Sequence, residues 1–435
     1  EPLAKPEIFM KVADKMEKNG GLEAYHSTPE SEFTAGHSCA KCKSTDFRRG
    51  MDILDVWFDS GISHAAVQAR RKELNEVADV YLEGSDQHRG WFQTSLLSAL
   101  ASKGHAPFKS LVTHGFVMDE KGRKMSKSLG NVVDPADTTK KLGAEILRLW
   151  ASYEDFGQDM GCGPEVLARV TESYRRFRNT MRFLLGNLGD FDPAKDQVPF
   201  EKMTSLDRWA LGRLNEMLRK STAGYENFEF YKVYHALNHF FTVDLSAGYL
   251  DMLKDRLYTS KKDGVERRSA QTVLYILLDN LVRVMAPITS FLAEETLTYI
   301  PGPKPESVFL LDFPKVQPKW DDEKLASEMA ALMEVRGEVS KSLETLRQAK
   351  TIGSGLDAKV TLSADGGKYE VLKKYESLLP EFFIVSQVHL KMGSFAVETL
   401  KAVGEKCERC WYFSTEIGKD VKHPTVCGKC SKALA

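Results

Sequence analysis

The sequence predicts a multidomain protein in which an α/β part is followed by an all-α part. Short β-like runs alternate with helical patterns from Met51 to about Tyr153, and apolar stripes with a 3.6-residue period run through residues 165–300. The chain has 435 residues, 42% hydrophobic and 28% charged. That is enough for about two to four globular domains. Because the net charge is −1, any nucleic-acid contact has to come from local basic faces.

Residues 1–50 are expected to form a connective segment. An amphipathic stretch around Val12 is followed by Gly- and Ser-containing sequence around the CxxC pair of Cys39 and Cys42. Because the chain does not begin with Met, we expect further sequence upstream. No window approaches the apolar run of about 20 residues that a membrane helix needs, and no signal peptide is recognisable. We therefore expect a cytoplasmic protein without membrane contact.

Residues 51–153 hold the predicted α/β layer. Its alternating β-like runs and helical pattern lie at residues 80–82, 94–100, 111–113 and 116–118. Asp134 and Pro135 then begin a second helix, since Asp is a favoured N-cap and Pro at the first helical position loses no hydrogen bond. This helix fixes the end of the loop that precedes it.

A helix bundle is predicted for residues 154–320, ended by a Pro-rich break at 301–305. Residues 321–398 are expected to form a small α/β junction. Its elements are a helix over about 321–350 and strand-like runs at 360–362 and 383–385. Residues 399–435 are too short for an apolar core but contain four cysteines, so a metal is expected to hold them.

The loop at residues 122–131, GRKMSKSLGN, carries three cations and two hydroxyls between glycines. Such a loop can clamp a polyphosphate, because ammonium groups neutralise its charge while hydroxyls and backbone N–H groups fix its oxygens. The alternative is a solvated basic hairpin. That alternative would be preferred for an arbitrary Lys-rich loop.

Two CxxC pairs near the C-terminus predict a zinc ribbon. Cys407 and Cys410 are separated from Cys427 and Cys430 by sixteen residues, a spacing that lets two tight turns present four thiolates. A closed shell of four thiolates leaves no position for water, so we expect one structural Zn²⁺ per chain.

Other candidate ligands are weaker. Cys39 and Cys42 supply only two thiolates. A metal site shared with His37 or with cysteines of upstream sequence and a free thiol pair therefore both remain open. Cys162 is expected to be structural. His235 and His239 are spaced like a metal pair, but without a third ligand they are expected to be core or surface residues.

Three strings together resemble the bacterial-type isoleucyl-tRNA synthetase family of class I aminoacyl-tRNA synthetases. The loop contains the KMSKS signature at residues 124–128. The strings DVWFDSG at 55–61 and YLEGSDQHRGWF at 81–92 look like blocks of the isoleucyl enzymes rather than of their valyl and leucyl relatives. The resemblance covers nearly the whole chain. It implies the second half of a Rossmann-type catalytic domain, a helical anticodon-binding domain, a small junction and a zinc module that helps to hold tRNA.

The resemblance also implies roles for individual residues. The catalytic residues would be Lys124 and Lys127, and the ATP-binding set would be Lys124, Met125, Ser126, Lys127, Ser128 and His114. The aminoacyl-adenylate set would be Trp57, Glu83, Gly84, Asp86, Gln87 and Trp91. Polar groups after a strand end can reach a ligand in the crevice beyond the sheet. Taken alone, however, the tryptophans would be core aromatics and the acids a strand-end turn.

The first helix of the bundle carries Arg175, Arg178 and Arg182 on one face. A solvated face would look the same, but the resemblance to an anticodon-binding domain makes these arginines candidates for tRNA phosphate contacts. The implied partners are tRNA-Ile, isoleucine and ATP with Mg²⁺, and the chain is expected to act as a monomer.

The main departure from the family is the second signature, HxGH, which none of the ten histidines forms. The family also has an editing domain, which would lie largely upstream. It is needed because isoleucine and valine differ by one methylene, a discrimination for which this family is the well-known example. We therefore expect a C-terminal portion of a synthetase. The rival hypothesis is a tRNA-binding module without catalytic activity.

Overall fold

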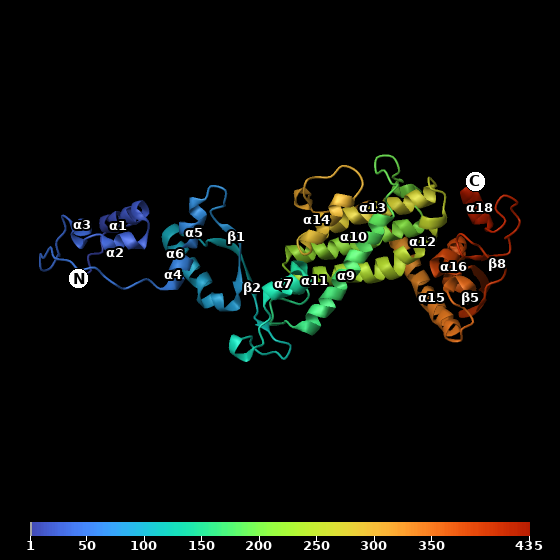
Figure 1. Cartoon of the computed structure of the whole chain (residues 1–435), viewed down its shortest axis with the longest axis horizontal. Helices are drawn as coiled ribbons and strands as arrows, with labels where there is room; N and C mark the ends of the chain where they lie inside the picture. The colour runs from blue at the N-terminus through green and yellow to red at the C-terminus, as the bar shows by residue number, and fades with distance from the viewer. Residues whose placement is uncertain (1) are drawn as a thin grey trace. The chain divides into compact units, whose positions relative to one another are not determined.

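A computed structural model of the chain describes residues 2–435, which form two compact units (Figure 1). The first unit ends at Leu111, and the second runs from Val112 to Ala435. Every helix among the described residues is too short or too polar to span a bilayer.

The first unit begins with a small helical cluster and continues into a strand–helix–strand unit. Ile8, Ala24 and Phe33 are the buried apolar residues of the cluster, and the amphipathic stretch predicted around Val12 is helical. Strands β1 and β2 pair with each other. The elements are α1 (Pro6–Asn19), α2 (Leu22–Ser27), α3 (Glu30–Thr34), α4 (Val56–Gly61), α5 (Ser63–Ala66), β1 (Ala78–Gly84), α6 (Trp91–Lys103) and β2 (Phe108–His114), the last of which contains the boundary between units.

The KMSKS loop lies near the start of the second unit. Strand β3 (Val117–Met118) precedes the loop and pairs in parallel with β4 (Met160–Gly161). Helices α7 (Pro135–Leu142) and α8 (Ala144–Ala151) follow the loop. Asp134 caps α7 by accepting a hydrogen bond from the Ala136 N–H at 2.7 Å, as the sequence predicted.

The predicted helix bundle is confirmed. It holds the largest fully buried side chains of the described residues, among them Phe177, Phe241 and Tyr249. A π-helical segment, η5, interrupts it at Gly248, whose φ of −102° and ψ of −105° are not helical; no pattern in the sequence indicated this segment. The bundle consists of α9 (Pro164–Gly186), α10 (Ser205–Glu226), α11 (Phe230–His239), η5 (Phe240–Tyr249), α12 (Leu250–Thr259), α13 (Val265–Met285) and α14 (Ser290–Tyr299).

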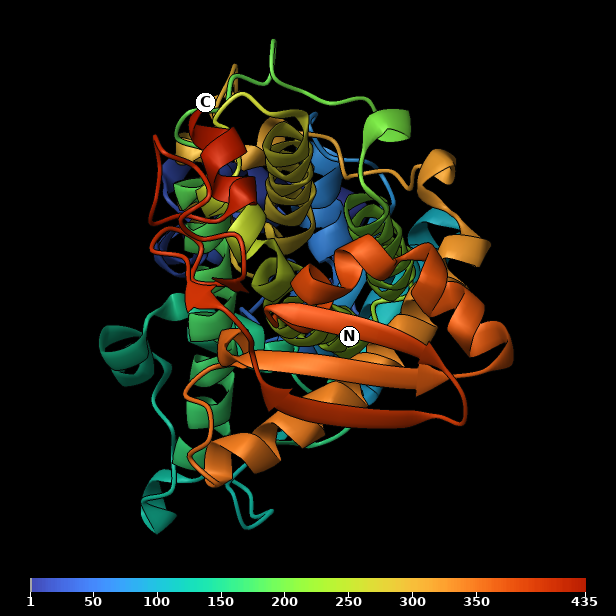
Figure 2. The ribbon, with the colours of Figure 1, turned by 90° about the vertical axis from the view of Figure 1, so that its right-hand side faces the viewer.

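The junction is a three-stranded sheet covered by helices, which Figure 2 shows in orange and red. Strand order is β6-β5-β7, with β5 parallel to β6 and antiparallel to β7. Alternate residues of β5 are buried. The elements are α15 (Glu323–Gln348), β5 (Ala358–Ala364), α16 (Gly366–Lys374), α17 (Leu379–Phe383), β6 (Gln387–Met392) and β7 (Ala396–Lys401).

The strand predicted at residues 383–385 is wrong. Phe383 ends α17, and Ile384 has a left-handed φ of 55°, so the chain reverses there before β6 begins at Gln387. Pro380 at the start of α17 favours the helix, since proline fits the first helical turn. Burial of Phe382 and Phe383 as a helical pair therefore outweighs their strand propensity.

The C-terminal module has little regular structure. Strands β8 (Glu405–Lys406) and β9 (Phe413–Ser414) form a short antiparallel pair, and α18 (Gly428–Leu434) ends the chain. Its buried cluster consists of Val426 and the four cysteines of the two CxxC pairs. The module thus lacks an apolar core, as its length predicted.

Candidate functional site

One buried carboxylate, that of Asp119, holds the KMSKS loop together. Its Oδ1 accepts hydrogen bonds from the backbone N–H groups of Lys121 at 2.9 Å and Arg123 at 2.8 Å. Its Oδ2 accepts from the Asn131 amide at 3.0 Å and from the Arg123 guanidinium at 2.9 Å. The hydrogen bond from Asn131, followed by those from Arg123, holds the pKa of Asp119 well below its ordinary value. Asp119 is therefore ionised and ties the two ends of the loop together.

Asn131 fixes the other side of the loop. Its Oδ1 accepts from the Ser126 N–H at 2.9 Å, and Ser126 Oγ in turn accepts from the Leu129 N–H at 3.3 Å. Met125 packs against the main hydrophobic core. The backbone is thus held from within, although the sequence identified neither Asp119 nor Asn131 as a site residue.

The predicted phosphate-binding groups lie on the exposed side of this pinned loop. Lys124, Lys127 and Ser128 are exposed, and Ser128 Oγ lies 3.1 Å from Ser126 Oγ. Within residues 2–435 neither lysine forms an ion pair with a carboxylate. Two free ammonium groups and two hydroxyls on one preorganised loop form a suitable cradle for a polyphosphate anion.

His114 ends β2 and is half-buried. Its Nδ1 lies 2.8 Å from the carbonyl oxygen of Gly115. A proton on Nδ1 would make this a hydrogen bond and leave Nε2 as the acceptor for a ligand.

Glu83, Gly84, Asp86 and Gln87 of the predicted adenylate-binding set lie at the end of β1 in the first unit. Glu83 Oε2 accepts from the N–H of Gly84 at 3.0 Å, and Gln87 Oε1 accepts from the N–H of Trp91 at 2.9 Å. Gln87 Nε2 lies 3.3 Å from Asp86 Oδ2. Asp86 and Gln87 follow the strand end, as the sequence predicted, whereas Glu83 is the penultimate residue of β1, because the strand continues to Gly84.

The two tryptophans differ in setting. Trp91 stacks on Tyr81 with ring centroids 4.3 Å apart and donates its indole N–H to Ser60 at 3.0 Å, as a core aromatic would. Trp57 is exposed, and its ring lies so close to Gly90 that a Cβ there would be 3.0 Å from Trp57 Cζ3. Gly90 therefore lets Trp57 lie against the start of α6, and the exposed face of Trp57 is free to form the wall of a pocket.

The four C-terminal cysteines converge. The Sγ atoms of Cys407, Cys410, Cys427 and Cys430 all lie within 4.8 Å of one another, and all four residues are buried. The Cys427 N–H donates to Cys407 Sγ at 3.3 Å. Four soft donors at this spacing fit a tetrahedral metal ion of the zinc type.

These thiols differ in how readily they ionise when no metal is bound. Burial opposes ionisation of Cys407, but the N–H groups of Cys410 and Cys427 outweigh it and lower the pKa of this thiol to about 7. Burial raises the pKa of Cys410 above its ordinary range and that of Cys430 to about 12. Without a metal only one of these three thiols ionises readily, whereas a divalent cation deprotonates coordinating thiols.

Comparison with known proteins identifies the family. A family model described as tRNA synthetases class I (I, L, M and V) matches residues 3–162. The anticodon-binding domain of tRNA ligase matches 207–362, and the zinc finger found in FPG and IleRS matches 404–433. Isoleucine–tRNA ligases from Geobacter sulfurreducens and Syntrophotalea carbinolica are 49% and 46% identical over 100% of this chain. The chain belongs to the isoleucyl-tRNA synthetase family.

The chain spans 48% of the length of each of these two synthetases. A solved ternary complex, LeuRS-tRNA-LeuAMS from Agrobacterium radiobacter K84, matches 86% of this chain and 45% of that chain. Its TM-score is 0.50 and its identity 17%, so it shows a likeness of fold. The predicted fold class is confirmed, and the cysteine cluster is the zinc site of an isoleucyl-tRNA synthetase zinc finger.

The three arginines predicted to contact tRNA do not have the same surroundings. Arg175 and Arg182 are exposed, whereas Arg178 forms a two-pronged ion pair with Glu295 of α14. The hydrogen bond from Arg178 lowers the pKa of Glu295, so this pair stays charged. Arg178 is therefore already occupied by a carboxylate within the synthetase chain.

The Cys39 and Cys42 pair adopts the same turn as the first zinc pair. Cys39 accepts at its carbonyl from the Lys43 N–H at 2.9 Å, and its own N–H donates to Ser44 at 2.8 Å. In the zinc finger Cys407 makes the equivalent bonds with Trp411 and Tyr412 at 2.9 Å. Lys43 and Trp411 both have positive φ, 61° and 66°. This backbone geometry favours a shared metal site over a free thiol pair. Cys39 and Cys42 would supply two of the ligands of that site.

Proposed function

We propose that the chain provides the ATP-phosphate loop, the adenylate-binding strand end and the tRNA-binding part of an isoleucine–tRNA ligase. The reaction is activation of isoleucine by ATP with Mg²⁺, release of pyrophosphate, and transfer of the isoleucyl group to tRNA-Ile. We also propose that it works in the cytoplasm as a monomer. The pinned KMSKS loop, whose two lysines pair with no carboxylate in the described part of the chain, carries this proposal, supported by the isoleucine–tRNA ligase relatives.

The chemistry follows from where charge develops. As the isoleucine carboxylate attacks the α-phosphorus of ATP, negative charge accumulates on the departing pyrophosphate. Lys124 and Lys127 would neutralise it, while Ser126 and Ser128 would hold its oxygens. Glu83 and Gln87 would bind the amino group and ribose of the adenylate, and Trp57 would contact the apolar side chain. No covalent bond to the protein is needed, because positioning and charge stabilisation supply the catalysis.

Isoleucine-dependent pyrophosphate exchange, measured on this chain, tests the proposal. Replacing Lys127 by Ala is expected to reduce the exchange rate by about 100- to 1,000-fold, since one stabilising cation is lost from the transition state. Lys121→Ala is the matched control, because that lysine is exposed immediately before the loop and lies outside the signature.

Equal losses in the two variants would contradict the role of Lys127. A chain that binds tRNA-Ile but catalyses no exchange would favour the second candidate, a tRNA-binding module without activity.

The arginine face makes a separate prediction. Glu295→Gln should strengthen tRNA binding by freeing the Arg178 guanidinium for a phosphate. The dependence of log K on log salt should steepen by about 0.7–0.9 for one added phosphate contact. Glu172→Gln is the control, because Glu172 pairs with Arg176 on the same helix, outside the predicted set. An equal salt dependence in both variants would exclude Arg178 as a phosphate ligand.

A further inference from the structure

Two carboxylates fasten the KMSKS loop to the helix bundle, one on each side of the loop. Glu120 lies between β3 and the loop, and Glu145 lies in α8, after the loop. Each accepts a hydrogen bond from a free N–H group in the first turn of a bundle helix. Such a carboxylate is favoured there by the helix dipole and by the unpaired N–H groups.

Glu120 reaches the start of α9. Its Oε1 accepts from the Glu165 N–H at 2.7 Å. Because Pro164 has no N–H, Glu165 offers the first donor of the helix. Gly163 makes room for this contact, since a Cβ there would lie 2.3 Å from Glu120 Cγ. The pairing of Met118 with Gly161 brings the two segments side by side.

Glu145 reaches the start of α14. It is 6% exposed, and its Oε1 accepts from the Leu292 N–H at 3.0 Å. Arg148, one turn later in α8, donates to the carbonyl oxygens of Pro287 and Ile288 at 2.6 and 2.9 Å. Burial and a hydrogen bond with Glu145 raise the pKa of Tyr174, in α9, to about 12. The hydrogen bond from Leu292 therefore joins α8 to α14 through Glu145.

The two helices are in turn joined to each other by the Arg178–Glu295 ion pair. These contacts form a continuous series. Glu120 joins the loop to α9, the ion pair joins α9 to α14, and Glu145 joins α14 to α8. Helix α8 follows the loop along the chain. Any ligand that competes for Arg178 therefore acts on the connection between the two anchor points of the loop.

We infer that Glu120 and Glu145 are positioning residues that couple the occupancy of the KMSKS loop by ATP to the occupancy of the arginine face by RNA. The inference rests on the proposed function for its two ligands. By linkage, the factor by which RNA changes the affinity for ATP must equal the factor by which ATP changes the affinity for RNA. The physical basis is a continuous series of two hydrogen bonds and one ion pair between the two sites.

The coupling is measured by titrating the full chain with MgATP, by calorimetry, with and without saturating tRNA-Ile. The unsubstituted chain should show a change in ATP affinity of about fivefold or more. Glu120→Ala should bring this ratio close to one. Glu120→Gln should restore it, because the amide oxygen still accepts from Glu165. Glu165→Ala is the matched control, since it removes a neighbouring carboxylate but keeps the backbone donor.

A second measurement does not depend on either ligand. Amide hydrogen exchange of residues 121–131 in the free chain should be about tenfold faster in Glu120→Ala than in Glu120→Gln. Unchanged exchange, or a coupling ratio that survives Glu120→Ala, would overturn the inference. So would a chain that binds both ligands without coupling. If neither ligand binds, the proposed function fails, and the exchange experiment alone decides whether Glu120 holds the loop.

Discussion

Replacing Asp207 by Asn is expected to lower the free energy of unfolding of the second unit by about 3–5 kcal/mol, because it removes one partner of a buried ion pair. Asp207 is fully buried in the first turn of α10 and accepts from both Nη atoms of Arg256, at 2.8 and 3.0 Å. It also accepts from the Tyr249 hydroxyl at 2.6 Å and from Ser269. Asparagine keeps the shape and removes the charge.

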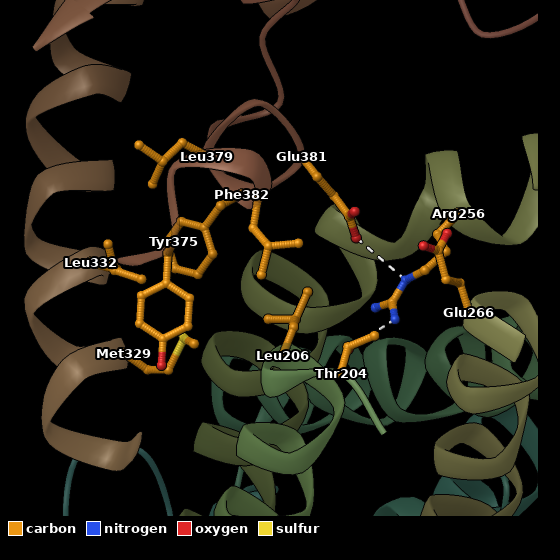
Figure 3. A pocket seen from close by; sticks show the side chains of 11 residues that line it. Thr204, Leu206, Arg256, Glu266, Met329, Leu332, Tyr375, Leu379, Glu381 and Phe382 are labelled. Atoms are coloured by element: carbon orange, nitrogen blue, oxygen red, sulfur yellow. Dashed lines mark hydrogen bonds and ion pairs between the residues drawn. The ribbon is translucent and has the colours of Figure 1, made fainter. Parts of the chain in front are cut away.

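The loss is large because Arg256 cannot escape to water or give up its proton. Its side chain is 4% exposed; burial opposes its charge, but Asp207 and Glu381 outweigh burial and raise its pKa above the ordinary value. Figure 3 shows this guanidinium between Thr204 and Glu381, at the edge of a pocket where the bundle meets α15 and α17. In the Asp207→Asn variant, only the Glu381 carboxylate, 3.4 Å from Nε, would remain to balance it.

Urea unfolding followed by circular dichroism at the helical band measures this effect. Glu338→Gln is the matched control, because its ion pair with Lys341 is exposed and such pairs contribute about 1 kcal/mol or less. Equal midpoint shifts for the two variants would show that the buried pair contributes no more than a surface pair.

Loss of zinc is expected to unfold the C-terminal module while leaving the bundle folded. The buried residues of the module are the four ligands and Val426, so no apolar core replaces the metal. Structural zinc supplies about 10–16 kcal/mol in zinc-finger peptides. Cys430→Ser should therefore reduce the zinc content and release Lys429, which pairs with Asp255 of the bundle.

Metal analysis and amide exchange of residues 404–433 check this prediction. Cys162→Ser serves as the control, because Cys162 is buried in the main core, away from the zinc cluster. Because zinc binding releases thiol protons, the affinity for zinc should fall as the pH is lowered. Full zinc content in Cys430→Ser, or an exchange pattern equal to that of the unsubstituted chain, would refute the structural role.

Sequence patterns predicted those elements that depend on interactions between residues close together in the chain. Asp134 and Pro135 mark the start of α7 by capping chemistry alone, and the CxxC spacing is sufficient to predict the zinc cluster. The strand predicted over residues 383–385 failed because packing of a short helix overrode propensity. The residue-level roles in adenylate, ATP and tRNA binding stay predictions.

The interactions that position the loop could not be predicted from the sequence, for a different reason. Glu145 and Leu292 are 147 residues apart, and Arg178 and Glu295 are 117 apart. A single sequence contains no signal that pairs such distant residues, because many other carboxylates in the chain have similar neighbouring residues. Asp119 and Asn131 are closer, but their hydrogen bonds follow from the shape of the loop rather than from residue type.

The junction sheet has a consequence for how the protein behaves at high concentration. Strands β6 and β7 are its outer strands within the described residues, so each has one side without a strand partner. Exposed His389 and Lys391 on β6, and Glu398 and Lys401 on β7, place ionisable groups along these edges. Charged edges discourage strand addition by a second copy. Neutralising them should promote aggregation through this sheet before it affects any ligand site.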